Sequence, residues 1–262
     1  MRPNPVVSVE RHQTPSLPTQ KYTEYPGKDL DAMAFATNYR RWIMDFLRPF
    51  VGRHIIEVGA GTGVYSELLL EASPESLTVL EPSFNLYSHL VYHLPRLDSK
   101  GVLEIRHSNF PDAWTGGLQR HVPDTAVYIN VLEHIDEDDA ELNAVFAALP
   151  RGGRILIFVP ALPFLMSRMD AEFGHFRRYT LRKLAAKCSA AGFKINLARY
   201  FDVLGILPWL VKYRLLKSKT LKPSAVRIHD RFVVPVSRSL ERVLTPPCGK
   251  NIILVGEKTT AH

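Results

Sequence analysis

Short apolar runs that alternate with helical patterns constrain the fold of this chain most strongly. The runs occupy positions 55–58, 77–80, 102–105, 126–129 and 155–159. Apolar residues at helical spacing follow the first, second and fourth of them. Strands that are apolar on both faces are typical of parallel sheets, because the helical connections between parallel strands cover both sides. The alternation therefore predicts a doubly wound α/β sheet with helices on both faces.

The two ends of the chain depart from this rhythm. Five prolines fall within positions 1–28, which predicts a flexible N-terminal arm and leaves 29–262 as a single domain. Beyond the fifth run, an alternating segment that starts at Phe193 and an apolar run at 251–255 predict two more strands. Between those strands, positions of about 202–248 form a basic and partly apolar insertion. We expect this insertion to lie over the ligand-binding edge of the sheet.

Charge and cysteine content limit the function classes. Cys188 and Cys248 show no disulfide or metal-binding spacing, and no apolar run reaches the ~20 residues that span a bilayer. We therefore expect a cytoplasmic protein, with peripheral contact to the inner membrane surface left open. The last 62 residues carry 11 basic and 4 acidic side chains, whereas the first 200 carry 22 of each. This basic segment predicts an anionic partner or a solvated surface.

A glycine-rich loop is the most specific local signal. Gly59, Gly61 and Gly63 lie between a strand and a helix, where glycine lets the backbone approach a ligand and the helix N-terminus offers N–H donors. The spacing departs from the G-x-G-x-x-G fingerprint of dinucleotide enzymes, which are the alternative. Glu57 would repel a pyrophosphate but suits an amino group, and Glu81 ends the next strand, where a carboxylate accepts ribose hydroxyls. The pattern favours S-adenosylmethionine over NAD.

Four segments resemble the successive motifs of class I S-adenosylmethionine-dependent methyltransferases. They are HIIEVGAGTG, LTVLEPS, INVLEHIDEDDAEL and LPRGGRILIFVPA, and the resemblance extends from about Asn38 to Glu257. It implies a Rossmann-like, seven-stranded sheet in the order 3-2-1-4-5-7-6 with the last strand antiparallel. A narrower likeness, which includes the segment GHFRRYT, is to a bacterial methyltransferase-domain subgroup linked to glycosyl-transfer or lipid-related pathways.

The resemblance also implies a set of cofactor contacts. By this likeness the three glycines approach the methionine part of S-adenosylmethionine, Glu81 holds the ribose, and Asn109 replaces an acid often found near the adenine. Tyr39 would close over the sulfonium by a cation–π contact or be ordinary packing. Asn130 ends the fourth strand, beside the transferred methyl group. The predicted cofactor set is Tyr39, Glu57, Gly59, Ala60, Gly61, Gly63, Glu81, Pro82, Asn109, Phe110, Asn130 and Val131.

A polar segment after the fifth strand is the predicted catalytic segment. His175 is the best candidate for a general base, because histidine titrates near working pH, and Asp170 would orient it. Arg177 and Arg178 would clamp an anion, or the whole segment would be a structural loop with internal pairing. His134, after the fourth strand, would face the methyl group or shape a buried loop. No residues show metal-ligand spacing, so no metal site is predicted.

The acceptor is the least defined part of the function. We expect methylation of a small-molecule or lipid-like acceptor, with oxygen as the preferred atom and an anionic group as a further feature. The stretch 205–219 joins apolar bulk to lysines, which predicts a peripheral membrane contact or a lid helix. The alternatives are an RNA methyltransferase, which rests on charge alone, and a membrane-surface or cofactor-binding protein without catalysis.

Overall fold

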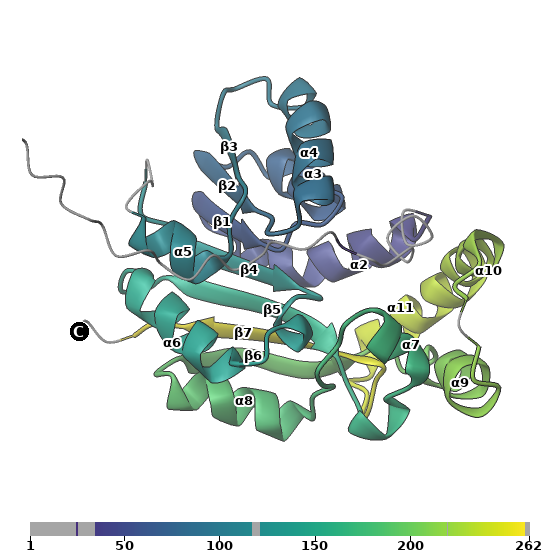
Figure 1. The fold of residues 1–262 in the computed structure, drawn as a ribbon. Coiled ribbons are helices and arrows are strands. Elements are labelled where there is room, and N and C mark those ends of the chain that lie inside the picture. The colour runs from purple at the N-terminus through teal and green to yellow at the C-terminus, as the bar shows by residue number, and fades with distance from the viewer. Residues whose placement is uncertain (1–24, 26–34, 117–120, 219, 260–262) are drawn as a thin grey trace, which may run out of the picture.

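One mixed sheet organises the protein. A computed structural model describes residues 25, 35–116, 121–218 and 220–259, so the predicted arm at 1–28 lies outside the described residues except for Tyr25 (Figure 1). The strand order is β3-β2-β1-β4-β5-β7-β6, and β7 runs antiparallel to both neighbours, which confirms the predicted topology. The strands are β1 (His54–Val58), β2 (Ser76–Leu80), β3 (Leu103–Arg106), β4 (Thr125–Ile129), β5 (Arg154–Pro160), β6 (Lys194–Phe201) and β7 (Asn251–Glu257).

The helices connect these strands. The α-helices are α2 (Thr37–Leu47), α3 (Val64–Glu71), α4 (Phe84–His93), α5 (Phe110–Thr115), α6 (Asp138–Ala148), α7 (Arg168–Glu172), α8 (Leu181–Ala190), α9 (Ile206–Trp209), α10 (Pro223–Ile228) and α11 (Val234–Val243). The 3-10 and π segments are η1 (Arg48–Phe50), η2 (Leu94–Arg96), η3 (Leu132–His134), η4 (Pro163–Leu165), η5 (Leu210–Leu215) and η6 (His229–Val233).

Successive strand residues enter two separate cores, which is the physical basis of the doubly wound arrangement. Ile55 and Val127 pack in the core that includes α2, α3 and α4. Their neighbours Ile56 and Tyr128 pack in the core that includes α5, α6 and α8. Because adjacent strand side chains point to opposite faces, a strand buried on both sides must be apolar throughout. The predicted apolar runs therefore meet helices on both faces of the sheet.

The third strand lies one residue later than predicted. The apolar run at 102–105 becomes a strand at Leu103–Arg106. Asp98 accepts the backbone N–H groups of Val102 and Leu103, so the preceding turn extends to the start of the run. The N–H of Val102 is thus bonded to the Asp98 side chain, and Val102 stays outside β3.

The insertion after β6 forms a helical cover over one edge of the sheet. Figure 1 shows α9 and α10 beyond the ends toward which β4 and β5 point. Buried carboxylates anchor this cover to the domain. Asp230 accepts the backbone N–H groups of Asn38 and Tyr39 at the start of α2, at 3.0 and 2.9 Å. Glu241 accepts the backbone N–H of Val203 at 2.9 Å, which ties α11 to the end of β6.

Candidate active site

The glycine loop after β1 has a backbone that only glycine adopts easily. Gly59 and Gly63 have φ angles of 68° and 84°, in the left-handed region. A Cβ atom on Gly59 would lie 2.7 Å from Val131, and one on Gly63 would lie 2.7 Å from Leu90. The N–H groups of Gly59 and Ala60 donate to the carbonyl of Leu80, which fixes the loop to β2. The loop is therefore held open for a ligand at the N-terminus of α3.

Two buried carboxylates flank this loop. Glu57 accepts a hydrogen bond from Ser66, and burial raises the pKa of Glu57 to about 8. Glu81 accepts the N–H groups of Gly61 and Ser83, both at 2.8 Å. Burial raises the pKa of Glu81, although these two bonds oppose the rise. Glu81 thus holds the glycine loop in place, and its carboxylate lies beside that loop, not in bulk solvent.

A cavity of about 320 Å³ extends from the glycine loop to the loops that follow β4 and α7. Its walls include Tyr39, Glu57, Gly59, Ala60, Gly61, Asn130, His134 and His175 from the predicted site. Trp209, Tyr213 and Leu221 of the insertion also line it. The insertion therefore covers this edge of the sheet. Ligands of doubly wound sheets bind at this carboxyl edge.

The remaining predicted residues lie outside these walls. Gly63 is the N-cap residue of α3, Val131 packs against Gly59, and Glu81 accepts the N–H of Gly61. Pro82 accepts a hydrogen bond from the His107 ring at 3.0 Å. Asn109 caps α5 by accepting the N–H of Asp112, and Phe110 is buried in the core beneath α5 and α6. In the structure these positions have structural roles, and none of them lines the cavity.

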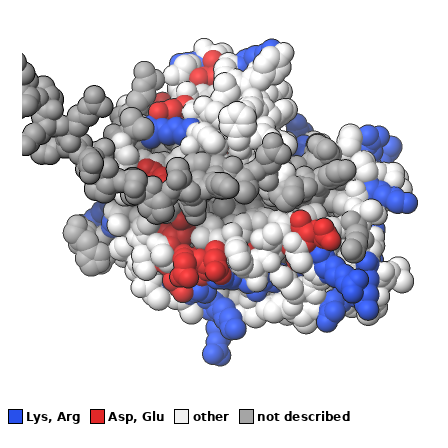
Figure 2. Space-filling view, in the orientation of Figure 1, with Lys and Arg blue, Asp and Glu red and all other residues white. Residues whose placement is uncertain are grey.

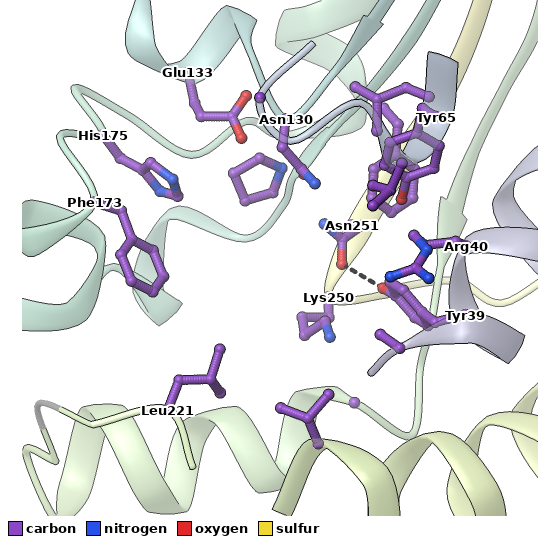
Figure 3. A pocket seen from close by; sticks show the side chains of 18 of the residues that line it. Tyr39, Arg40, Tyr65, Asn130, Glu133, Phe173, His175, Leu221, Lys250 and Asn251 are labelled. Atoms are coloured by element: carbon purple, nitrogen blue, oxygen red, sulfur yellow. Dashed lines mark hydrogen bonds between the residues drawn. The ribbon is translucent and has the colours of Figure 1, made fainter. Parts of the chain in front are cut away.

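The last strand contributes cavity residues that the sequence pattern missed. The Tyr39 hydroxyl donates to the Asn251 side chain at 2.9 Å, and the Lys250 ammonium lies 4.8 Å from the Tyr39 ring centroid (Figure 3). Burial raises the pKa of Tyr39 well above its ordinary value. Because β7 is antiparallel, Asn251 pairs with Pro160 at the end of β5. An antiparallel strand begins at the edge where its parallel neighbours end. The predicted antiparallel direction of the last strand could therefore have placed Asn251 and the preceding Lys250 at the ligand edge.

The predicted catalytic segment forms a buried network. His175 Nδ1 lies 3.0 Å from Asp170 Oδ1, and Arg178 Nε donates to the same oxygen at 2.7 Å. Burial alone raises the pKa of Asp170, but the bonds from His175, Arg178 and Ser167 lower it below its usual range. Arg177 pairs with Asp136 and Asp138 at 2.9 and 2.8 Å. Both arginines are thus engaged in internal ion pairs, as in the structural-loop alternative.

Glu133 and His134 complete this end of the cavity. Burial raises the pKa of Glu133 to about 7. Burial, with some repulsion from His175, lowers the pKa of His134 to about 4. The centroids of the His134 and His175 rings are 4.7 Å apart. The ligand atoms of Glu133, His134 and His175 all lie within 4.8 Å of one another, a convergence that the sequence pattern did not predict.

Fold and loop together define the class of this protein. The strand order 3-2-1-4-5-7-6, with a glycine loop after the first strand and a cavity at the carboxyl edge, is that of the class I methyltransferases. The chain belongs to the methyltransferase-domain family, whose model matches residues 32–197. It is an S-adenosylmethionine-dependent methyltransferase.

Solved structures share the fold at low sequence identity. A SAM-dependent methyltransferase from Archaeoglobus fulgidus is 15% identical, with a TM-score of 0.55 over 88% of this chain and 99% of that chain. N-methyltransferase NodS from Bradyrhizobium japonicum, solved with S-adenosyl-l-homocysteine, is 9% identical, with a TM-score of 0.55 over 91% and 95%. A Haloferax volcanii methyltransferase in complex with the Trm112 activator is 13% identical, with a TM-score of 0.56 over 89% and 96%. No curated protein matches the chain.

Proposed function

We propose that this enzyme methylates an oxygen atom of a small-molecule or lipid-like acceptor. The proposal rests on one observation: a continuous cavity joins the glycine loop to Glu133, His134 and His175. One end suits the cofactor and the other end presents polar groups to the acceptor. A cavity of this size, mostly apolar with a few converging polar groups, is typical of small-ligand sites.

The cofactor end fits the chemistry of S-adenosylmethionine. Gly59 and Ala60 let the backbone approach the methionine part, and a Cβ on Gly59 would disturb the packing of Val131. Glu57 is buried with a raised pKa, so a cofactor ammonium group would favour its charged form. We assign the ribose to Glu81, supported by its place beside the loop. Asn109, Phe110 and Pro82 complete the proposed nucleoside side.

Methyl transfer to oxygen requires two things of the enzyme, orientation of the reactants and removal of a proton. The acceptor oxygen forms a bond to the methyl carbon, the S–CH₃ bond breaks, and its electron pair stays on sulfur. Orientation of the two reactants alone lowers the barrier by about 7–11 kcal/mol. An O–H acceptor must also lose its proton. His175 is the group that assists, because Asp170 engages its Nδ1 and the other ring nitrogen remains for the cavity.

The acceptor end supports a partly apolar, anionic molecule. Phe173, Trp209 and Leu221 provide apolar walls. Lys212 brings positive charge to the cavity, whereas the ammonium of Lys250 is paired with the buried Asp202 at 2.9 Å. An acceptor with an apolar body and an acidic group matches this lining. The lining thereby favours a lipid-like metabolite over RNA, whose recognition depends on extended phosphate contacts.

The test is methyl transfer from labelled S-adenosylmethionine into a cell extract that is then separated into lipid, small-molecule and RNA fractions. We expect label in the lipid or small-molecule fraction. Label in RNA would support the RNA methyltransferase instead. Tight binding of S-adenosylhomocysteine by calorimetry, without label in any fraction, would favour a cofactor-binding protein without catalysis. The same calorimetry with NAD is expected to show no binding.

We further propose that the insertion lies on an anionic membrane surface. Ile228, Phe232, Val236 and Leu240 recur every four residues along α10 to α11, and all are exposed. Leu207, Val211 and Leu215 repeat this pattern along α9 and η5. Spacing of three or four residues aligns side chains on one face of a helix. No described helix is long and apolar enough to cross a membrane, so this contact would be peripheral.

The charges of the insertion match such a surface. Arg227, Arg231 and Arg242 are exposed beside the apolar residues, whereas the acidic Asp230 and Glu241 are buried against the domain. Figure 2 shows basic side chains gathered on the side of the molecule where α9 and α10 lie. Apolar residues combined with arginine and lysine are typical of helices that lie in a membrane interface.

A double substitution of Phe232 and Val236 by serine is expected to weaken binding to vesicles of phosphatidylcholine and phosphatidylglycerol by at least about 10-fold, because burial of each apolar side chain contributes about 1.5–3 kcal/mol. Vesicle sedimentation measures the change. Tyr92→Ser, an exposed aromatic on α4, is the matched control and should bind like the wild type. Equal binding by the double variant, or no binding by the wild type, contradicts the membrane contact.

A further inference from the structure

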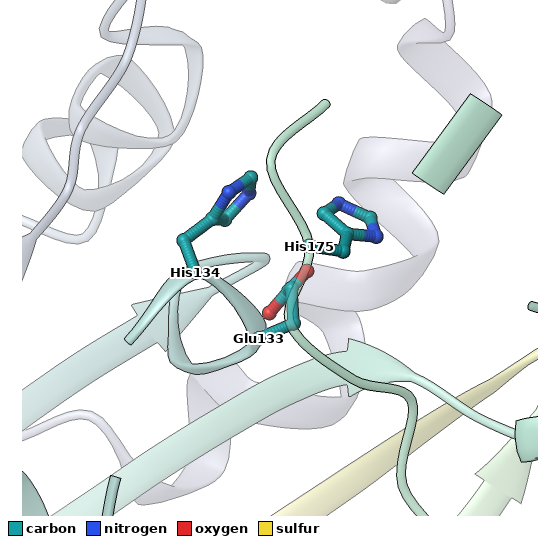
Figure 4. A group of neighbouring side chains, drawn as sticks. All are labelled: Glu133, His134 and His175. Carbon is teal, nitrogen blue, oxygen red and sulfur yellow. The ribbon is translucent and has the colours of Figure 1, made fainter. Parts of the chain in front are cut away.

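Glu133, His134 and His175 come together from two loops at the acceptor end of the cavity. Glu133 and His134 belong to η3 after β4, and His175 follows α7 (Figure 4). Each residue offers one ligand atom, and these atoms all lie within 4.8 Å of one another. Within the part of the chain that the structure describes, this is the one group of three such residues.

A neighbouring polar group orients each of the two imidazole rings. Asp170 Oδ1 lies 3.0 Å from His175 Nδ1, and Asp170 itself is fully buried and fixed by Ser167 and Arg178. The backbone of Gly174 forms a hydrogen bond with the His134 ring. In metal sites, ligand histidines almost always donate their second ring N–H to a carboxylate or a backbone carbonyl, which orients the ring. The arrangement here has one partner of each kind.

The carboxylate of Glu133 gives an independent indication. The residue is 0% exposed, and neither carboxylate oxygen has a hydrogen-bond partner among the described residues. A buried carboxylate without a partner is costly, and buried charges are usually paired or coordinate metals. Arg178, whose charge acts on Glu133, is already bonded to Asp170 and to the carbonyl of Ala161. A bound cation would supply the missing partner of Glu133.

We infer that Glu133, His134 and His175 bind a divalent transition-metal ion of the Zn²⁺ type. Two imidazoles and one carboxylate suit Zn²⁺, Co²⁺ or Fe²⁺ better than Mg²⁺ or Ca²⁺, which prefer oxygen ligands. Three protein ligands leave a coordination position for the acceptor oxygen. This inference rests on the proposed function and deepens it, since His175 then assists the acceptor as a metal ligand. An O–H group bound there would lose its proton to water, and its oxygen would attack the methyl carbon while the S–CH₃ bond breaks and its electron pair stays on sulfur.

The experiment is a calorimetric titration of the chelator-treated full chain with Zn²⁺, and an absorption titration with Co²⁺. We expect one equivalent to bind to the wild type. Loss of a residue that only orients a metal ligand already lowers metal affinity by about 10-fold or more. Glu133→Gln and His175→Gln remove ligands themselves, so each should weaken Zn²⁺ binding by at least about 10-fold. His54→Ala is the control. His54 begins β1, at the end of the strand away from the cavity, and lies near His121 and Glu75, a group that could bind Zn²⁺ adventitiously. Its high-affinity binding should equal that of the wild type.

The outcomes separate this inference from the proposed function. Absence of saturable Zn²⁺ binding, or equal binding by Glu133→Gln and His175→Gln, overturns the metal site. Binding of S-adenosylhomocysteine by the same variants shows that the cavity is still folded. Methyl transfer that persists unchanged after removal of metal also overturns the inference, while it leaves the methyltransferase function standing.

Discussion

His175→Gln is expected to lower the turnover of methyl transfer by about 10²–10⁴-fold, the contribution typical of a group that assists proton loss. Asp170 engages Nδ1 of this ring, so the other ring nitrogen is the one left for the cavity. Glutamine retains polarity and approximate size but replaces the imidazole. Single-turnover kinetics with labelled S-adenosylmethionine measure the effect.

Affinity for S-adenosylhomocysteine should stay within about twofold in this variant, because the cofactor end of the cavity is formed by Gly59 and its neighbours. The change should therefore fall on kcat rather than on cofactor binding. His89→Gln is the control, because His89 is an exposed histidine on α4. Turnover within a factor of three of the wild type would rule out a catalytic role for His175.

Asp170→Ala is expected to lower the free energy of unfolding by about 3–5 kcal/mol, the usual cost of breaking a buried ion pair by removing one partner. The side chains of Asp170 and Arg178 are 0% and 2% exposed, and their ion-pair distance is 2.7 Å. Without Asp170, the buried guanidinium loses its counter-ion and His175 loses its orienting partner. Urea denaturation followed by circular dichroism measures the change.

Asp136→Ala is the matched control for this loss. Asp136 pairs with the neighbouring arginine, Arg177, at 2.9 Å, but its side chain is 67% exposed. Exposed ion pairs contribute about 0–1 kcal/mol, so the control should unfold at nearly the wild-type urea concentration. A similar small loss in both variants would mean that the Asp170 network does not stabilise the folded loop.

The parts of the site that lie close in sequence were the parts that could be predicted. Glu57, Gly59 and Gly61 belong to one strand and its turn, and their spacing carries the conformational requirement of the loop. The pairing of Asp170 with His175 also spans only five residues. The boundary of β3 was wrong by one residue, because the capping carboxylate of Asp98 competes with the sheet.

Contacts between distant segments were the parts that could not be predicted. Glu133 and His175 are 42 positions apart, and Tyr39 meets Asn251 across 212. The inward direction of Asp230 and Glu241 depends on α2 and β6, against which their helices pack. Side-chain periodicity identifies the faces of an element but does not name the element that covers each face.

The amino-acid sequence by itself determined the alternation of strands and helices, the burial of the sheet on both faces and the glycine loop. The spacing of apolar residues determines the first two features, and the conformational freedom of glycine determines the third. Both act over a few neighbouring residues. Only the tertiary structure decided which side chains share the cavity. Parallel strands bring all their carboxyl ends to one edge, and the antiparallel β7 brings its first residue to the same edge. Residues far apart in the chain therefore meet there for a topological reason that no local pattern contains.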